Sequence, residues 1–387
     1  MRRQLPYSCQ TVGAAEAAAV AAAVQDAFLT GGATLGRFEA RLAETVGARH
    51  AIAVSSGTAA LHTAYLAAGV GRGDTVLTSP ITFVATANAA VLCGATPAFA
   101  DTDERGNLDP SAVAAAAAAR VVVPVHYAGH PAPTAAIAGA ARGALVVEDA
   151  CHALGSVDGS TPVGACRDAA MAVFSFHAVK TITTGEGGAI VTNDAHLAAR
   201  CRRLRDHGLV RDPAALEEAF GPWSYEQHEV GLNYRLTDIQ AALGLVQLDR
   251  LGEFVARRQA IARRYDALLA TVANVMPVSP MRGTQSAYHL YPVRVPASLR
   301  RAAFETLRAA GIGVQVQYIP VHLQPWYRRA LGTGPGDCPR AEQLYREVLS
   351  LPCFPSMSDA DVVRVVAALA AIVATTREES EHVHPAW

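Results

Sequence analysis

The stretch Ser175-Phe-His-Ala-Val-Lys-Thr-Ile-Thr-Thr-Gly-Glu-Gly-Gly188 lies between two apolar runs, 170–174 and 188–192, and contains Lys180, the only lysine of the chain. The other 32 of its 33 Lys and Arg residues are arginines. An arginine supplies positive charge but stays protonated, whereas a lysine amine can lose its proton and attack a carbonyl carbon. Lys180 is therefore a candidate Schiff-base nucleophile. The alternative is a lysine left by chance on the surface, which the neighbouring glycine-rich turn at 183–188 disfavours.

Composition excludes several classes of function. The chain has 387 residues, enough for two or three domains, and its 51% hydrophobic and 17% charged content is typical of a globular protein. A net charge of −1 argues against binding to nucleic acid or to an anionic membrane. The N-terminus shows no apolar signal core, and the most apolar tract, 362–376, contains Arg364 and is too short to span a bilayer. We expect a soluble, cytoplasmic protein.

The seven cysteines are scattered along the chain. Their spacing matches neither a metal site nor a disulfide framework. We therefore expect reduced thiols, mostly in the core, and no bound metal.

Short apolar strands alternate with helices through the first half of the chain. The expected strands are 50–54, 75–78, 96–100, 121–126, 144–149, 170–174 and 188–192, and the expected helices include 14–28, 38–46, 61–68, 82–93 and 110–120. Near-continuous apolar strands that alternate with helices indicate an α/β protein, with a mostly parallel sheet covered on both faces.

Candidate ligand-binding residues follow several of these strands at their carboxyl ends. They are Ser56, Gly57, Thr58, Ala59, Phe83, His126, Asp149, His152 and Ser175. Ligands bind at the carboxyl ends of strands in sheets of this kind. We therefore expect one site to gather these residues.

The turn and helix that begin at Ser55 are the arrangement in which helix N–H groups hold an anion, usually a phosphate. The alternative is an ordinary helix capped by Ser56 or Thr58. Asp149, at the end of an apolar strand, either caps the following segment or faces a cationic ring nitrogen. A lysine, a carboxylate for a ring nitrogen and a phosphate-binding turn together indicate pyridoxal 5′-phosphate.

The sequence resembles the DegT/DnrJ/EryC1/StrS family of aminotransferases over nearly its whole length. The motifs that carry the resemblance are Leu5-Pro-Tyr-Ser-Cys-Gln10, Leu29-Thr-Gly-Gly32, Ser56-Gly-Thr-Ala-Ala-Leu61, Glu148-Asp-Ala-Cys-His-Ala-Leu-Gly155, Ser175-Phe-His-Ala-Val-Lys180, Thr184-Gly-Glu-Gly-Gly188, Asp206-His-Gly208 and Gly231-Leu-Asn-Tyr-Arg-Leu-Thr-Asp238. The resemblance implies fold type I: a mostly parallel seven-stranded sheet flanked by helices, with a smaller C-terminal α+β domain. We expect the large domain at 1–250, with the N-terminal segment contributing to the small domain, and the small domain at 251–387.

The resemblance also implies a role for each matching residue. Lys180 and Asp149 are the expected catalytic pair, and Asp149 pairs with the ring nitrogen of the cofactor. The other expected cofactor contacts are Ser56, Gly57, Thr58, Ala59 and Ser175 at the phosphate, Phe83 stacked on the ring, His152 (often Gln in relatives) at the ring 3′-oxygen, and Asn233 from the neighbouring subunit. The expected substrate contacts are Tyr7, His177, Arg235, Tyr318 and His322. The active unit is then a homodimer with shared active sites.

Four further stretches, 79–89, 125–129, 174–180 and 313–325, are similar to the aminotransferases of pseudaminic acid biosynthesis. This similarity implies transfer of an amine from L-glutamate to a UDP-linked 4-keto-6-deoxy-N-acetyl-hexosamine. The alternatives are another keto-sugar or cyclitol substrate, or a protein that binds the cofactor or a nucleotide sugar without catalysis. A nicotinamide-dependent oxidoreductase is disfavoured, because no Gly-x-Gly-x-x-Gly follows the first strand.

Overall fold

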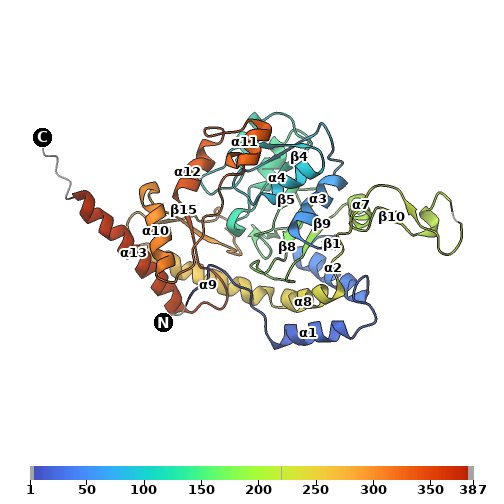
Figure 1. Ribbon diagram of the computed structural model, residues 1–387, viewed down its shortest axis with the longest axis horizontal. Helices are drawn as coiled ribbons and strands as arrows, with labels where there is room; N and C mark the ends of the chain where they lie inside the picture. The colour runs from blue at the N-terminus through green and yellow to red at the C-terminus, as the bar shows by residue number, and fades with distance from the viewer. Residues whose placement is uncertain (1–3, 219, 382–387) are drawn as a thin grey trace.

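The computed structural model describes residues 4–218 and 220–381, and within them a seven-stranded sheet forms the centre of the protein (Figure 1). In spatial order its strands are β1 (His50–Val54), β9 (Gly188–Thr192), β8 (Met171–Ser175), β5 (Leu145–Asp149), β4 (Val121–Val123), β2 (Thr75–Thr78) and β3 (Thr96–Phe99). Strand β9 runs antiparallel to both neighbours, and the remaining pairs are parallel. The prediction of an α/β protein with a mostly parallel sheet is confirmed.

Helices cover both faces of this sheet. One face carries α3 (Gly57–Ala67), α4 (Ala85–Leu92) and α7 (Ala195–Arg205), and the other carries α2 (Ala33–Val46), α8 (Asp238–Asp249), α5 (Pro110–Ala115) and α6 (Thr134–Ala140). Ile52 and Ala53, adjacent in β1, are both fully buried and pack on opposite faces. This two-sided burial explains why the strands are apolar at every position.

A second packed region is formed mainly by the C-terminal third of the chain. It contains a three-stranded antiparallel sheet, β12 (Met276–Pro277), β14 (Tyr291–Arg294) and β15 (Val348–Leu351), with α10 (Ala297–Ala309) and α13 (Asp359–Glu381). Helix α9 (Leu251–Leu269) joins the two regions: Phe254 packs with the central sheet and Tyr265 with the second region. Leu5 also packs in this second region. A domain boundary near residue 250 stays a prediction.

The remaining elements are short or lie at the edges. They are α1 (Ala14–Val24), which packs along α8, the hairpin β10 (Leu209–Val210) and β11 (Glu226–Gln227), the small sheet β6 (Val157–Asp158), β7 (Thr161–Pro162) and β13 (Thr284–Gln285), the helices α11 (Pro325–Leu331) and α12 (Pro339–Glu347), and the 3-10 turns Tyr127–Gly129, Pro213–Ala215 and Val321–Leu323. The β10–β11 hairpin projects from the body of the protein (Figure 1). Across the described residues, no helix has both the length and the apolarity needed to cross a membrane.

Two helix predictions were too long, since the helix predicted at 14–28 ends at Val24 and the one predicted at 110–120 ends at Ala115. The alanine-rich segment 110–120 is helical only to Ala115, and Ala116 is extended with φ −72° and ψ 160°. The chain then turns into β4, where the N–H of Arg120 donates to the carbonyl of Thr75 at 2.8 Å. Pairing with the sheet therefore outweighs the helix propensity of alanine in this segment.

The carboxylate of Asp238 holds the start of a distant helix. Its two oxygens accept hydrogen bonds from the N–H groups of Gly32, at 2.8 Å, and Leu35, at 3.0 Å. These groups lie at the N-terminus of α2, where N–H groups have no acceptor within the helix. Asp238 is 2% exposed. The last residue of the motif 231–238 is thus explained by helix capping.

Asp238→Ala should lower the free energy of unfolding by about 2 kcal/mol, because it leaves the buried N–H of Leu35 and the part-buried N–H of Gly32 without an acceptor. Urea denaturation of the variant measures this loss. The matched control is Asp249→Ala, which removes an exposed carboxylate paired with Arg41 and should cost at most about 0.5 kcal/mol. Equal effects of the two variants would contradict the capping role.

Candidate active site

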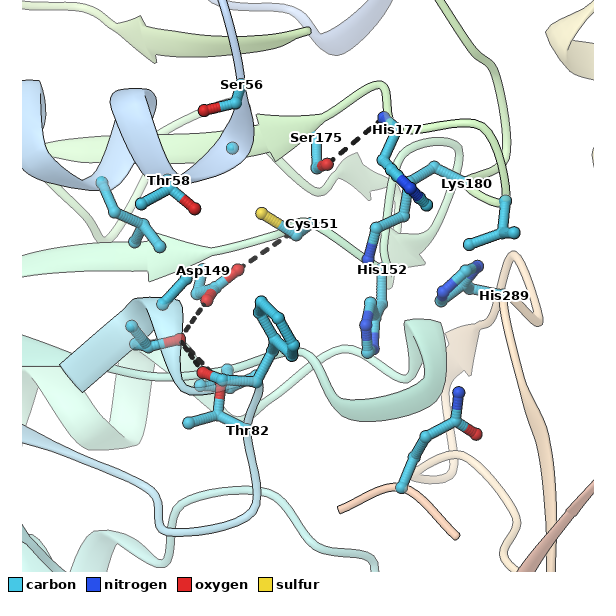
Figure 2. A pocket seen from close by; sticks show the side chains of 18 of the residues that line it. Ser56, Thr58, Thr82, Asp149, Cys151, His152, Ser175, His177, Lys180 and His289 are labelled. Atoms are coloured by element: carbon cyan, nitrogen blue, oxygen red, sulfur yellow. Dashed lines mark hydrogen bonds between the residues drawn. The ribbon is translucent and has the colours of Figure 1, made fainter. Parts of the chain in front are cut away.

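A cavity of about 390 Å³ lies where the parallel strands end. Figure 2 shows Asp149, His152, Ser175 and Lys180 around it. The predicted site residues that line it are Tyr7, Ser56, Gly57, Thr58, Phe83, Asp149, His152, Ser175, His177, Lys180 and Tyr318. Residues from at least four strand ends therefore meet at a single space, as the sheet topology requires.

Lys180 lies on the turn between β8 and β9. Its N–H donates to the carbonyl of His177 at 2.9 Å, and the N–H of Thr184 donates to the carbonyl of Phe176 at 3.0 Å. Burial lowers the pKa of the Lys180 amine from its ordinary value, and the negative charge of Asp149 opposes the shift. Lys180 therefore lines a cavity in which its amine loses the proton at lower pH than it would in water.

Two glycines let the start of α3 approach the lysine turn closely. A β-carbon on Gly188 would lie 2.4 Å from the carbonyl oxygen of Ser56, and one on Gly57 would lie 2.9 Å from the β-carbon of Ser175. Because even alanine would overlap there, glycine at these positions sets the spacing between α3 and the ends of β8 and β9.

Ser56 is the N-cap of α3, and its hydroxyl accepts a hydrogen bond from the N–H of Ala59 at 3.0 Å. The ordinary-cap alternative is therefore correct for Ser56. The N–H groups of Gly57 and Thr58, in the first turn, have no acceptor within the helix and line the cavity. Ala59 is buried behind them and does not line it. The helix start is thus both capped and able to bind an anion.

The carboxylate of Asp149 is 5% exposed and accepts two hydrogen bonds. The N–H of Cys151 donates to Oδ1 at 3.2 Å, and the hydroxyl of Thr86 donates to Oδ2 at 2.7 Å. The Thr86 oxygen lies 2.7 Å from that of Thr82. The Thr86 hydroxyl has only one proton and donates it to Asp149, so the Thr82 hydroxyl must donate to the Thr86 oxygen. Asp149 therefore both caps the following turn and presents an oriented carboxylate to the cavity (Figure 2).

Two histidines pack together beside Lys180. The rings of His152 and His289 are 4.4 Å apart between centroids, and His152 Nε2 lies 3.0 Å from the hydroxyl of Tyr318. Burial holds the pKa of both histidines well below the ordinary value, and the charge of Lys180 adds to the shift. Both rings are therefore neutral at physiological pH, and each carries a single N–H.

Besides Ala59, three predicted site residues lie outside this cavity. Asn233 is exposed and pairs with Asp206 through a β-bridge, and Arg235 forms an ion pair with the Asp206 carboxylate. The placement of His322 corrects the prediction for that residue. Its ring is fully buried, and Nε2 lies 3.1 Å from the carboxylate of Glu342. His322 ties α12 to the preceding turn and does not reach the cavity.

Sequence reasoning missed three contributors to the site: Thr82 and Thr86, which orient Asp149, and His289. Thr86 lies one helical turn beyond Phe83, which was predicted, so the spacing along α4 gave a usable signal. His289 lies in the bend just before strand β14, and nothing local marks it as a site residue. Only the packing of the two regions brings it to His152.

The residues of the cavity fit pyridoxal 5′-phosphate. Lys180 is an amine that loses its proton readily, as the aldehyde requires. Asp149 is a buried carboxylate suited to a protonated ring nitrogen. The N–H groups of Gly57 and Thr58, with the hydroxyls of Thr58 and Ser175, suit a phosphate. Among the described residues, Nδ1 of His152 is buried without a hydrogen-bond partner and can serve a further polar atom of the ligand.

Comparison with known proteins agrees with this fit. The chain matches the DegT/DnrJ/EryC1/StrS aminotransferase family over residues 10–370. It is 40% identical over 379 residues to the spore coat polysaccharide biosynthesis protein SpsC of Bacillus subtilis (strain 168), which covers 95% of this chain and 97% of that protein.

The solved structures that resemble this chain include sugar aminotransferases. PseC of Helicobacter pylori, an aminotransferase involved in the biosynthesis of pseudoaminic acid, has a TM-score of 0.90 at 31% identity, covering 96% of this chain and 100% of that chain. The PLP form of a putative sugar aminotransferase from Streptococcus pneumoniae has a TM-score of 0.89 at 26% identity, covering 96% and 99%. The chain therefore belongs to the DegT/DnrJ/EryC1/StrS family and is a pyridoxal phosphate-dependent sugar aminotransferase.

Proposed function

We propose that this enzyme transfers the amino group of L-glutamate to a UDP-linked 4-keto-6-deoxy-N-acetyl-hexosamine, at C4. One observation carries the proposal: Lys180, the only lysine of the chain, lines the same cavity as Asp149, and the pKa of its amine is lowered. Similarity to PseC across 96% of the chain supports this choice of sugar. A second candidate is another keto-sugar destined for a surface polysaccharide, which the 40% identity to SpsC favours.

The side chains around the cavity divide the work of transamination. Bound pyridoxal phosphate supplies the aldehyde that takes up the amine and the ring that accepts electrons. With the cofactor bound, Lys180 Nζ would be the amine that attaches to the aldehyde and the base that moves the proton during transamination. The Asp149 carboxylate holds a proton on the ring nitrogen. The N-terminus of α3 binds the phosphate, and Phe83, which is 58% exposed, covers the ring.

The substrate side of the cavity includes residues from distant parts of the chain. Tyr7 comes from the N-terminal segment, where the hydroxyl of neighbouring Ser8 donates to the carbonyl of Val179 at 3.3 Å. His177 lies 3.9 Å from the carboxylate of Glu186 across the lysine turn. Both residues line the cavity next to Lys180, so they are suited to contact sugar hydroxyls.

The proposal includes a homodimer with shared active sites. Asn233 is exposed, and Arg235 lies beside it with its guanidinium anchored on Asp206. Neither side chain lines the cavity of its own chain. A second copy of the chain that packed against this surface would receive both side chains at its cavity, where an amide and a guanidinium suit phosphate groups.

Purified enzyme supplied with L-glutamate should aminate the UDP-linked 4-keto-6-deoxy-N-acetyl-hexosamine at least about tenfold faster, as kcat/KM, than dTDP-linked 4-keto sugars. Tenfold corresponds to about 1.4 kcal/mol of preferential transition-state binding. Mass spectrometry of the products measures the rates, and nuclear magnetic resonance assigns the aminated carbon. Preferred turnover of a dTDP-linked sugar would favour the second candidate, and no turnover of any keto-sugar would contradict the proposal.

Thr86→Val should lower kcat/KM about tenfold and leave the fold intact. The substitution keeps the shape of the side chain but removes the hydrogen bond to Asp149 Oδ2, and a hydrogen bond to a charged group contributes about 1.5 to 3 kcal/mol. Steady-state kinetics measure the effect. The matched control is Thr63→Val, because Thr63 is also fully buried on a neighbouring helix and its hydroxyl has no partner among the described residues. Similar losses in both variants would show that Thr86 does not act through Asp149.

Sharing of active sites predicts that two inactive variants rescue each other. Lys180→Ala removes the nucleophile, and Asn233→Asp places a carboxylate where it repels the cofactor phosphate. In a mixed dimer with Asn233 acting across the interface, one site carries both defects and the other carries none. Refolding the two variants together should therefore restore about a quarter of the activity of the intact enzyme, the statistical expectation for random pairing. Activity assays give this fraction.

Subunit exchange in the refolded mixture is verified with a mass tag on one variant. If exchange is complete and the mixture stays inactive, Asn233 acts within its own chain, and the shared-site proposal is wrong. Lys180 keeps its role in either case.

A further inference from the structure

His152 has one nitrogen paired and one unpaired. Nε2 lies 3.0 Å from the hydroxyl of Tyr318, whereas Nδ1 is buried and has no hydrogen-bond partner among the described residues. The side chain is 6% exposed and lines the cavity. A buried polar nitrogen without a partner is costly, and a ligand atom that reached Nδ1 would remove this cost. Whether Nδ1 can donate or only accept depends on the tautomer of the ring.

Tyr318 decides between the two tautomers. The pKa of the Tyr318 hydroxyl is raised well above its ordinary value by burial, so this hydroxyl keeps its proton. The same cause keeps the His152 ring neutral, with one N–H and one lone pair. An imidazole nitrogen is a stronger acceptor than a phenol oxygen, so Tyr318 donates to Nε2. The ring proton is then on Nδ1.

We propose that Tyr318 is a positioning residue that fixes His152 as the Nδ1–H tautomer, so that Nδ1–H donates a hydrogen bond to the ring oxygen of pyridoxal phosphate. The inference rests on the cofactor assignment and deepens it. The ring oxygen is on the carbon next to the one that bears the aldehyde, and Lys180 lines the same cavity as His152. Tyr318 thereby acts on the cofactor through His152, rather than as the sugar contact expected from the sequence.

The tautomer has a consequence for the charge on the cofactor. A donor at the ring oxygen stabilises negative charge there, so the bound cofactor gives up its proton at lower pH. Without the Tyr318 hydroxyl, His152 is free to place its proton on Nε2 and to turn a lone pair toward that oxygen. The bound cofactor should then hold its proton to higher pH. The titratable groups around His152 are Tyr318, His126, His289 and Lys180, with Asp149 and Cys151 on its own segment.

The first test is the tautomer itself, measured by ¹⁵N nuclear magnetic resonance on full-length protein labelled at histidine, with and without bound pyridoxal phosphate. The His152 signal is assigned by its absence from His152→Gln. We expect the proton on Nδ1 in the parent protein, and a shift toward Nε2–H in Tyr318→Phe. A proton on Nε2 in the parent protein, or an unchanged tautomer in Tyr318→Phe, would overturn the proposal. The measurement without cofactor does not depend on enzyme activity. A wrong tautomer proposal can therefore be told apart from a wrong proposed function.

The second test is the pH midpoint of the absorbance change of the bound cofactor. Tyr318→Phe should raise this midpoint by about 0.5 to 1 pH unit, the size expected for the loss of one hydrogen bond. The matched control is Tyr127→Phe. It removes another buried hydroxyl, which donates to the carbonyl of Gln317 at 2.5 Å and does not touch His152, and it should leave the midpoint unchanged.

A double variant separates positioning from general structural damage. In the His152→Gln background, the side-chain amide donates without any choice of tautomer, so Tyr318→Phe should shift the midpoint by less than about 0.2 pH unit. An equal shift in both backgrounds would show that Tyr318 does not act through His152 and would refute the proposal.

Discussion

Removal of the Lys180 amine from water is the interaction on which the site depends. Burial disfavours the ammonium form, and the negative charge of Asp149 opposes that effect without cancelling it. An arginine in this place would stay protonated, which explains why the chain keeps a lysine here and nowhere else. The surrounding structure holds Lys180 in this buried position beside Asp149. The turn from β8 to β9 holds the backbone of Lys180, and Gly188 lets α3 close against it.

The site is assembled from both packed regions of the protein. The central sheet supplies Lys180, Asp149 and the start of α3, whereas His289 and Tyr318 come from the C-terminal part of the chain. Helix α9 packs with both regions. The residues that line the cavity are therefore held by two different cores. A substitution in the second core can change the environment of His152 without touching the sheet.

Much of the fold and of the site followed from the sequence, because its signals are local. The apolar strands and the small-residue turn before α3 show burial and helix capping directly, and Lys180 and Asp149 stand at strand ends, where ligands bind. Failures occurred where tertiary packing decides. The alanine helix ends at Ala115 because the chain must enter β4. His322 resembles a ligand-binding residue in sequence, but its ring lies against the carboxylate of Glu342, twenty residues further along the chain, and does not reach the cavity. His289 became a site residue only through contacts between segments.

The central claim is that Lys180 alone links the chain to its cofactor, and labelling tests it most directly. Borohydride reduction of the enzyme loaded with pyridoxal phosphate, followed by digestion and mass spectrometry, should place one pyridoxyl phosphate per chain on the peptide that contains Lys180. Lys180→Arg should remain folded and take up no label, because its guanidinium stays protonated. The chain contains no other lysine that could take the label. Label on a different peptide, or equal labelling of Lys180→Arg, would contradict the account.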